Sequence, residues 1–389
     1  MSPNTEFIPF ARPVLGAEEE QAVLRVMRSG WLTTGHEAQL FEQEFAEYCG
    51  VPHAIAVSSA TAGLHLALEA LGIQPSDQVA VSPYTFAASA EVIRYLGADP
   101  VFVDIEPQSF NIDHDALRRV AARQPIQAVM PVHVAGYPCR NPEIRDIAAQ
   151  HGAVVVEDAA HSFPARDDGA IIGSQSDAGV FSFYATKTIT TGEGGMLVCT
   201  DAEVSERARV MRLHGIDRPV WNRYRAPAAN HDYEVIAPGY KYNLPDLLAA
   251  LGRVQLRRAE EFHKRRLHIA EHYLAALADC EELQLPPHDR PQSWHLFILR
   301  LRLEKLAIDR DTFIALLGDA GIGSSVHYRP LHLMPYYRQR YALSPGDFPI
   351  SLDTYRRSVS LPIYPALRDS EVERICIAVR AICRQHRVR

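Results

Sequence analysis

Short runs of apolar residues alternate with helical patterns between about residues 53 and 200. The run "HAIAVS" (53–58) predicts a strand, and "TAGLHLALEALG" (61–72) follows it with apolar residues at helical spacing and a closing glycine. Further apolar runs of five to eight residues predict strands at 78–82, 100–105, 127–134, 153–159, 178–184 and 195–200. Continuous β-branched runs are typical of strands buried on both faces, so the pattern predicts an α/β domain with a parallel sheet.

The pattern changes after "PGYKYNLPDLLAALGRVQL" (238–256). A long charged helix, "RRAEEFHKRRLHIAEHYLAAL", is predicted to follow and to lead into a second part of the chain. That part holds one clear strand at 294–301 and helices at 309–320 and 369–385. We therefore expect a large α/β domain over residues 1–255, including the N-terminal segment, and a small C-terminal α+β domain over 256–389.

Composition limits the classes of partner. The 389 residues are 47% hydrophobic and carry 47 acidic against 40 basic side chains, a net charge of -7 that does not favour nucleic acid or an anionic membrane. No apolar run is long enough to span a bilayer, and the N-terminus has no signal-peptide pattern. The six cysteines form no CxxC pair, which favours reduced, buried thiols. We expect a cytoplasmic protein.

Residues able to do chemistry gather in the segments that follow the predicted strands. These are "SSAT" (58–61), "SPYTF" (82–86), "EDAAHS" (157–162) and "SFYATK" (182–187). In α/β sheets, ligands bind outside the strand ends. The small residues of "SSAT" would let backbone N–H groups of a helix start reach a phosphate, although a serine or threonine there could equally be a simple helix cap.

Two of these segments carry charged groups. Asp158 follows a buried strand, where a carboxylate is costly unless it caps a helix, binds a metal or pairs with a bound cation. No second cluster has metal-ligand spacing, so no metal is expected. Lys187 stands among small residues, and a lysine kept from water can form Schiff bases with carbonyls, although most lysines are surface charges. Together these are the parts of a pyridoxal phosphate (PLP) site.

Several long motifs in order resemble the fold-type I, PLP-dependent sugar-nucleotide aminotransferases of the DegT/StrS group. They run from "SGWLTTGHEAQLFEQEFAEYCG" (29–50) through "VVVEDAAHS" and "FSFYATKTITTGEGG" to "GIGSSVHYRPLHLMPYYRQRY", and so cover nearly the whole chain. The resemblance implies a mostly parallel, seven-stranded sheet in the large domain. "SSATAGLH" and "PGYKYNL" resemble UDP-4-keto-pentose aminotransferases, whereas "SSVHYRPLHLMPYY" resembles the 4-keto-6-deoxyhexose enzymes.

The resemblance also implies roles for single residues. Lys187 would hold the cofactor covalently and shuttle a proton, Asp158 would pair with the pyridine nitrogen, and His161 would reach the phenolic oxygen. The remaining cofactor contacts would be Ala60, Thr61 and Ser182 at the phosphate and Phe86 on the ring, with Tyr84 a weaker stacking candidate.

Contacts across a dimer and with the substrate are implied as well. In relatives an asparagine of the "GYKYN" segment reaches the phosphate across a homodimer interface; here either Lys241 or Asn243 would do so. Candidate sugar-nucleotide contacts are Thr33, Thr34, Arg218, Trp221, His327, Tyr328 and Arg329.

The implied reaction moves an amino group from glutamate to a keto-sugar of a nucleotide sugar, at C4, for cell-surface polysaccharide, lipid A or glycoconjugate synthesis. Amination at C3 or of a keto-cyclitol is an alternative that the motifs leave open. Deoxygenating dehydratases of the group carry a histidine in place of the lysine, so Lys187 argues against that reading. A regulator on the same fold would have lost part of the Asp158, Ser182 and Lys187 set, which is intact here.

Overall fold

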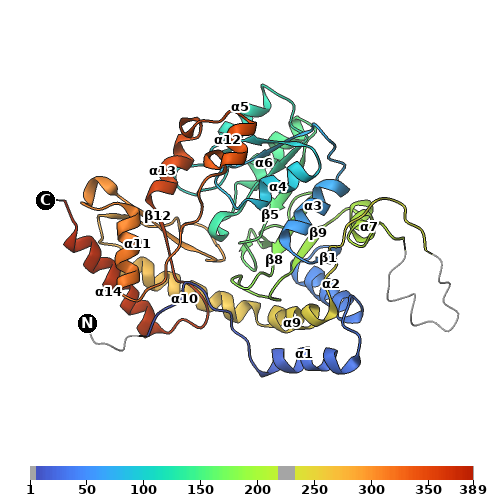
Figure 1. Cartoon of the computed structure of the whole chain (residues 1–389), viewed down its shortest axis with the longest axis horizontal. Helices are drawn as coiled ribbons and strands as arrows, with labels where there is room; N and C mark the ends of the chain where they lie inside the picture. The colour runs from blue at the N-terminus through green and yellow to red at the C-terminus, as the bar shows by residue number, and fades with distance from the viewer. Residues whose placement is uncertain (1–5, 218–232, 389) are drawn as a thin grey trace.

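The computed structural model describes residues 6–217 and 233–388. Its largest element is a seven-stranded sheet, at the centre and right of Figure 1. The strand order is β1-β9-β8-β5-β4-β2-β3. The strands are β1 (His53–Val57), β2 (Gln78–Val81), β3 (Asp99–Phe102), β4 (Ala128–Met130), β5 (Val154–Asp158), β8 (Ala178–Ser182) and β9 (Gly195–Cys199).

The sheet is mostly parallel, as predicted. Strands β3, β2, β4, β5 and β8 pair in parallel, whereas β9 pairs antiparallel with both β8 and β1. The β8–β9 connection contains no helix, and a connection without a crossover returns the chain antiparallel to the strand that it leaves. Lys187 lies in this connection, which places it above the end of β8.

Helices cover both faces of the sheet, giving three layers (Figure 1). Successive side chains of β5 show the alternation: Val156 packs into one core and Val155 into another on the opposite face. The first core contains residues of α3, α4 and α7, the second residues of α5 and α6, and a third, rich in phenylalanine, residues of α2 and α9. These helices are α2 (His36–Cys49), α3 (Ala60–Ala70), α4 (Ala88–Tyr95), α5 (His114–Ala121), α6 (Asn141–Gln150), α7 (Ala202–Met211) and α9 (Asp246–Arg257).

The C-terminal part has its own core around a three-stranded antiparallel sheet, β10 (Leu283–Gln284), β11 (Phe297–Leu301) and β12 (Ser358–Leu361). Helices α10, α11 and α14 pack against it, at the left of Figure 1. The remaining elements include the hairpin β6–β7 and the helices α1, α12 and α13. Their bounds are β6 (Arg166–Asp167), β7 (Ala170–Ile171), α1 (Ala17–Ser29), α10 (Ala259–Leu277), α11 (Arg310–Asp319), α12 (Pro335–Arg340), α13 (Pro349–Arg357) and α14 (Asp369–Gln385).

Two segments cross between the parts. Ile8 pairs with Ile322 and is buried in the C-terminal core, although it precedes the whole of the large sheet in the chain. In the other direction, Leu331 and Tyr337 pack into the core of the large sheet. The two parts are therefore held together by apolar packing on both sides. Among the described residues, no helix is long and apolar enough to cross a membrane.

A buried network of hydrogen bonds around Glu157 fixes β5 just before its end. The Glu157 side chain is fully buried and accepts hydrogen bonds from Asn141, from the backbone N–H of Gln175 (3.1 Å) and from His133 Nε2 (2.8 Å). Burial disfavours a charged imidazole, but contacts with Cys139 and Glu157 raise the pKa of His133. Glu157 thus points away from Asp158 and has a structural partner of its own.

Glu157→Gln is expected to lower the free energy of unfolding by about 1 to 3 kcal/mol, because a neutral amide replaces the buried carboxylate that accepts from His133, Asn141 and the Gln175 N–H. Chemical denaturation followed by circular dichroism measures the loss. Glu304→Gln is the matched control, since Glu304 is exposed and has no ion pair among the described residues. Equal stability of the two variants would contradict a stabilising role of the buried Glu157 hydrogen bonds.

Candidate active site

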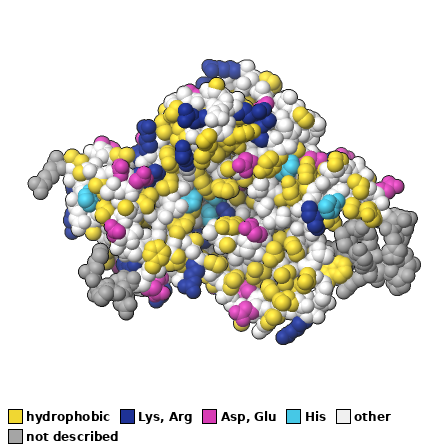
Figure 2. Space-filling model, viewed as in Figure 1, with side chains coloured by type: hydrophobic (Ala, Val, Ile, Leu, Met, Phe, Trp, Pro, Cys, Tyr) yellow, Lys and Arg dark blue, Asp and Glu magenta, His cyan; other side chains and the backbone are white. Residues whose placement is uncertain are grey.

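A cavity of about 480 Å³ lies at the carboxyl ends of β5 and β8, between the two parts of the chain. Large-sheet residues line one side, and His295, Leu296, His327, Tyr328 and Ile363 of the C-terminal part line the other. Histidine side chains are visible near the middle of the face drawn in Figure 2. Both parts of the chain are therefore needed to form the site, because neither one lines the cavity completely.

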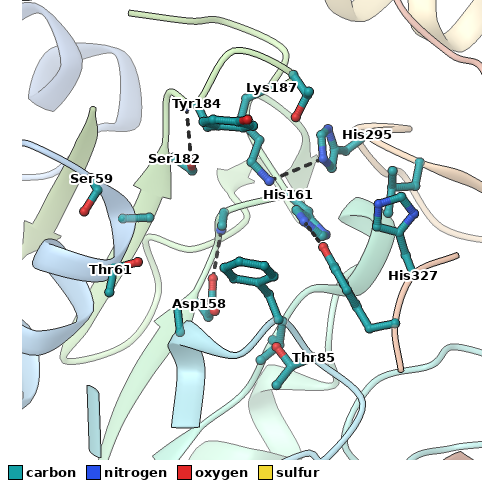
Figure 3. Close-up of a pocket in the computed structure, with 18 of the residues that line it drawn as sticks. Ser59, Thr61, Thr85, Asp158, His161, Ser182, Tyr184, Lys187, His295 and His327 are labelled. Carbon is teal, nitrogen blue, oxygen red and sulfur yellow. Dashed lines mark hydrogen bonds between the residues drawn. The ribbon is translucent and has the colours of Figure 1, made fainter. Parts of the chain in front are cut away.

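Lys187 points into this cavity (Figure 3). Its side chain is half-buried, and its Nζ lies 3.4 Å from Nε2 of His295. Removal from water lowers the pKa of Lys187 to about 7; the Asp158 carboxylate opposes this shift and the Arg266 guanidinium adds to it. A large fraction of Lys187 is therefore a neutral, nucleophilic amine near neutral pH.

Asp158 ends β5 and also lines the cavity. Its carboxylate accepts hydrogen bonds from the Ser89 hydroxyl (2.7 Å) and from the Ala160 N–H (3.2 Å). Burial raises the pKa of Asp158 in spite of these bonds and of nearby Lys187. This carboxylate has no direct cationic partner among the described residues, so a cationic group entering the cavity would stabilise its charge.

His161 and Tyr328 close the cavity beyond Asp158. His161 Nε2 and the Tyr328 hydroxyl are 2.9 Å apart, and the two rings are stacked with centroids 5.9 Å apart. Burial, and then the charge of Lys187, lowers the pKa of His161 well below its ordinary value. The neutral imidazole therefore shares one hydrogen bond with the Tyr328 hydroxyl at Nε2, and its buried Nδ1 has no hydrogen-bond partner among the described residues.

The opposite wall begins at the N-terminus of α3. Ser59 caps this helix by accepting the Ala62 N–H, so the capping interpretation of "SSAT" is correct for Ser59. Helix geometry leaves the N–H groups of Ala60 and Thr61 free for an anion. Both residues line the cavity, as does Ser182 at the end of β8. Capping and anion binding are thus divided between neighbouring residues.

Close packing keeps this helix start open. A Cβ atom on Gly195 would lie 2.7 Å from the Ala60 nitrogen, and one on Gly194 would lie 2.2 Å from Thr191 Oγ1. Only Gly192 of "TTGEGG" has a positive φ, +83°. The glycines of this segment therefore provide room for close packing more than they provide unusual backbone angles.

Gly195→Ala is expected to weaken binding of PLP to the apoprotein by at least about tenfold, because the added methyl group displaces the Ala60 N–H from the anion site. Fluorescence or absorbance titration with PLP measures the affinity. Gly318→Ala is the control: its Cβ would meet nothing within 4 Å, and alanine is the better helix former inside α11. Unchanged affinity in Gly195→Ala would contradict an anion site at this helix.

Other predicted residues lie in three different settings. Phe86 is 61% exposed and lines the cavity, with its ring 6.2 Å from that of Tyr328, whereas Tyr84 is buried outside it and donates to the His327 carbonyl. His327 and Tyr328 line the cavity, but exposed Arg329 does not. Predicted contacts Arg218 and Trp221 lie outside the described residues.

A separate polar cluster holds the residues predicted to act across a dimer. Lys241 Nζ donates to Asn243 Oδ1 (2.6 Å), and Asn243 Nδ2 donates to Thr34 Oγ1 (2.7 Å). None of these three, nor exposed Thr33, lines the cavity of Lys187 in the same chain. Both Lys241 and Asn243 are therefore placed apart from the site that this chain builds by itself.

Two site residues were missed at the level of sequence. His295 lies in "WHLFILRL", which the apolar pattern marked only as a strand, and Arg266 lies in the charged helix α10. A histidine at the start of an apolar strand was the one available signal. Their position beside Lys187 arises from packing of the C-terminal part onto the large sheet.

The residues present fit PLP. Ala60, Thr61 and Ser182 offer donors to its phosphate, buried Asp158 offers a carboxylate to its pyridinium nitrogen, and Lys187 offers a neutral amine to its carbonyl. In the described part of the chain, no group of three or more His, Cys, Asp or Glu residues could hold a metal ion.

Comparisons with known proteins agree with this geometry. The DegT/DnrJ/EryC1/StrS aminotransferase family model matches residues 13–380. The spore coat polysaccharide biosynthesis protein SpsC of Bacillus subtilis is 43% identical over 382 residues, 97% of this chain and 98% of that protein.

Solved structures agree as well. The putative sugar aminotransferase Spr1654 of Streptococcus pneumoniae, in its PMP-form, superposes with a TM-score of 0.90 at 29% identity, over 97% of this chain and 99% of that one. PseC of Helicobacter pylori, an aminotransferase of pseudoaminic acid biosynthesis, gives a TM-score of 0.90 at 27% identity, over 98% and 100%. Spr1654 is also solved in a PLP-form. The chain is a PLP-dependent sugar aminotransferase and belongs to the DegT/DnrJ/EryC1/StrS family.

Proposed function

We propose that this enzyme transfers the amino group of glutamate to the C4 keto carbon of a nucleotide sugar, in the synthesis of a cell-surface polysaccharide or lipopolysaccharide. The observation that carries the transfer chemistry is the half-buried Lys187 beside Asp158, with a pKa lowered to about 7. The similarity to SpsC, a spore coat polysaccharide biosynthesis protein, supports the polysaccharide role. The six buried, free cysteines support a reducing, cytoplasmic setting.

PLP supplies an electrophilic carbonyl and an electron sink when it is bound. Lys187 would hold the cofactor through its neutral amine and would move a proton at Nζ. Asp158 would keep a proton on the pyridine nitrogen, and the helix start at Ala60 and Thr61 would hold the phosphate. Phe86 would cover the ring face, and His161, which is hydrogen-bonded to Tyr328, would orient the ring.

We assign the substrate side of the cavity to His327 (Figure 3) and Tyr328, which belong to the C-terminal part and line the cavity together with Lys187. His327 Nδ1 lies 2.9 Å from the Ser360 hydroxyl, which leaves Nε2 for a sugar hydroxyl or a phosphate. Thr33, Thr34, Arg218, Trp221 and Arg329 remain candidate contacts for the nucleotide.

The test is incubation of the holoenzyme with glutamate and a panel of 4-keto and 3-keto nucleotide sugars, followed by mass spectrometry. Amine transfer to a 4-keto substrate is the expected result. Exclusive reaction of 3-keto sugars, or of a keto-cyclitol included in the panel, would replace the C4 assignment by one of the alternatives. Absence of transfer to every nucleotide sugar would overturn the substrate class.

We further propose a homodimer in which Lys241 or Asn243 completes the partner's phosphate site. The position of both residues outside their own chain's cavity supports this arrangement. A two-fold axis would complete two sites with one interface. Sedimentation velocity measures the state: an active monomer would contradict the proposal, and a loss of PLP affinity in only one of Lys241→Ala and Asn243→Ala would identify the residue that acts.

A further inference from the structure

His295 touches Lys187 from the side of the C-terminal part. Its Nε2 lies 3.4 Å from the Lys187 Nζ, and the ring is 6% exposed (Figure 3). Its Nδ1 is buried and has no hydrogen-bond partner among the described residues. Lys187 is thus the hydrogen-bond partner that the structure gives this imidazole, at a position in the strand segment before β11.

The surroundings of His295 keep its ring neutral. Burial, followed by the charges of Lys187, His161 and Arg266, lowers the pKa of His295 well below its ordinary value. A neutral imidazole has one nitrogen that accepts and one that donates. The other ionisable groups that face Lys187 are Asp158 on β5, Arg266 on α10, and His161 and His327 around the cavity.

Arg266 connects the backbones that carry the two residues. Arg266 is 1% exposed, and its guanidinium donates to the carbonyl oxygens of Ile363 (2.8 Å), Trp294 and His295 (both 3.3 Å). A longer contact of 3.5 Å reaches the carbonyl of Thr186, the residue before Lys187. Arg266 has no carboxylate partner among the described residues. Its fork of donors instead joins the Lys187 loop to the segment of His295.

We propose that His295 is a positioning residue for Lys187, with Arg266 as the clamp that fixes the spacing between them. The inference rests on the proposed role of Lys187. A neutral amine carries two N–H bonds and one lone pair, and it rotates freely about the Cε–Nζ bond. When His295 Nε2 accepts one N–H, that rotation stops, and the lone pair is held toward the cavity where the carbonyl of the cofactor is received.

The first test measures the reactivity of the Lys187 amine and does not depend on turnover. Full-length apoprotein is acetylated with trace acetic anhydride at a series of pH values, and mass spectrometry of the Lys187 peptide gives the midpoint at which the amine becomes reactive. In His295→Leu the midpoint is expected to fall by about one pH unit, because the ammonium form loses its acceptor. His295→Gln retains an acceptor and is expected to keep the midpoint of the wild type.

A purely structural role of His295 gives a different result. If the ring only fills space, its loss admits water, and the midpoint rises toward the ordinary lysine value in the leucine and glutamine variants alike. Such a rise, or equal midpoints in His295→Leu and wild type, would overturn the proposal. His151→Leu is the control: it removes an exposed histidine that does not line the cavity, and the midpoint is expected to stay unchanged.

The second test asks whether His295 acts through Lys187. Absorbance measures the rate at which the apoprotein captures PLP, at a pH above the acetylation midpoint of Lys187. This rate is expected to fall about tenfold in His295→Leu and to return to the wild-type value in His295→Gln. In the Lys187→Ala background, His295→Leu is expected to leave the non-covalent affinity for PLP unchanged. An equal loss of affinity in that background would refute positioning through Lys187.

The two proposals fail separately. If no keto-sugar is aminated, the proposed substrate is wrong, but the acetylation midpoints still report whether His295 holds the Lys187 amine. If Lys187 is reactive and the enzyme turns over while the His295 variants leave both readouts unchanged, only the positioning role is wrong. Arg266→Lys, which keeps the charge but loses the fork, is expected to slow PLP capture in the same direction as His295→Leu.

Discussion

Lys187→Ala is expected to lose turnover by at least about 10³-fold, because the chain loses both its nucleophilic amine and the group that moves the proton. The visible absorbance of covalently held cofactor is expected to disappear, while phosphate and carboxylate contacts still bind PLP. Steady-state assays with glutamate and spectra of the purified protein measure both effects. This is the largest single change that the structure predicts.

Lys305→Ala provides the control, because Lys305 is a surface lysine paired with Glu281 and lies outside the cavity. It is expected to retain both the absorbance and the turnover of the wild type. A Lys187→Ala protein that stays yellow and transaminates would mean that another amine holds the cofactor. The rest of the site would then need a different interpretation.

Asp158→Asn is expected to reduce turnover by about 10² to 10³-fold, because a neutral amide does not hold a proton on the pyridine nitrogen by charge. The same substitution is also expected to change the pKa of Lys187 in a known direction. The Asp158 carboxylate raises the pKa of Lys187, so its removal is expected to lower the midpoint of Lys187 acetylation in the apoprotein. Turnover assays and labelling measure the two consequences independently.

Loss of folding is separable from loss of catalysis in this variant. The pKa of Asp158 is higher in the folded apoprotein than in the unfolded chain. Ionisation of Asp158 therefore lowers the stability of the fold as the pH rises above the pKa of the unfolded chain. Asp158→Asn apoprotein is therefore expected to be at least as stable as the wild type at pH 7. Ser89→Ala, which removes one hydrogen bond to Asp158, is expected to have a smaller effect on turnover. Near-normal turnover in Asp158→Asn would refute the pairing with the pyridine nitrogen.

Local patterns account for most of the large sheet. Six of its seven strands fall inside the predicted runs, and β3 begins one residue before its run, because strands buried on both faces consist of continuous apolar residues that stand out against their flanks. The antiparallel direction of β9 was not predicted, although a helix-free connection between residues 182 and 195 was a usable signal. Strand β12 was missed, since its sequence "SVSL" is too short and polar to stand out.

The order of the motifs along the chain also indicated the cofactor and the main residues of its site. Lys187, Asp158, Ser182, Ala60 and Thr61 all line one cavity, because the carboxyl ends of parallel strands and the start of the following helix meet at one edge of the sheet. Sequence alone could not say that Ser59 takes the capping role while its neighbours stay free. That division depends on the backbone angles at residue 59.

Sequence by itself thus determined the sheet, the cofactor chemistry and the residues that short segments bring to the strand ends. Only the tertiary structure decided which groups approach Lys187 from residues 266 and 295. The Lys187–His295 and Thr186–Arg266 contacts join positions 108 and 80 residues apart through packing of a second core. Burial of the same kind lowers the pKa of Lys187. The desolvation of a group depends on all the residues packed around it, and the local sequence does not show which residues these are.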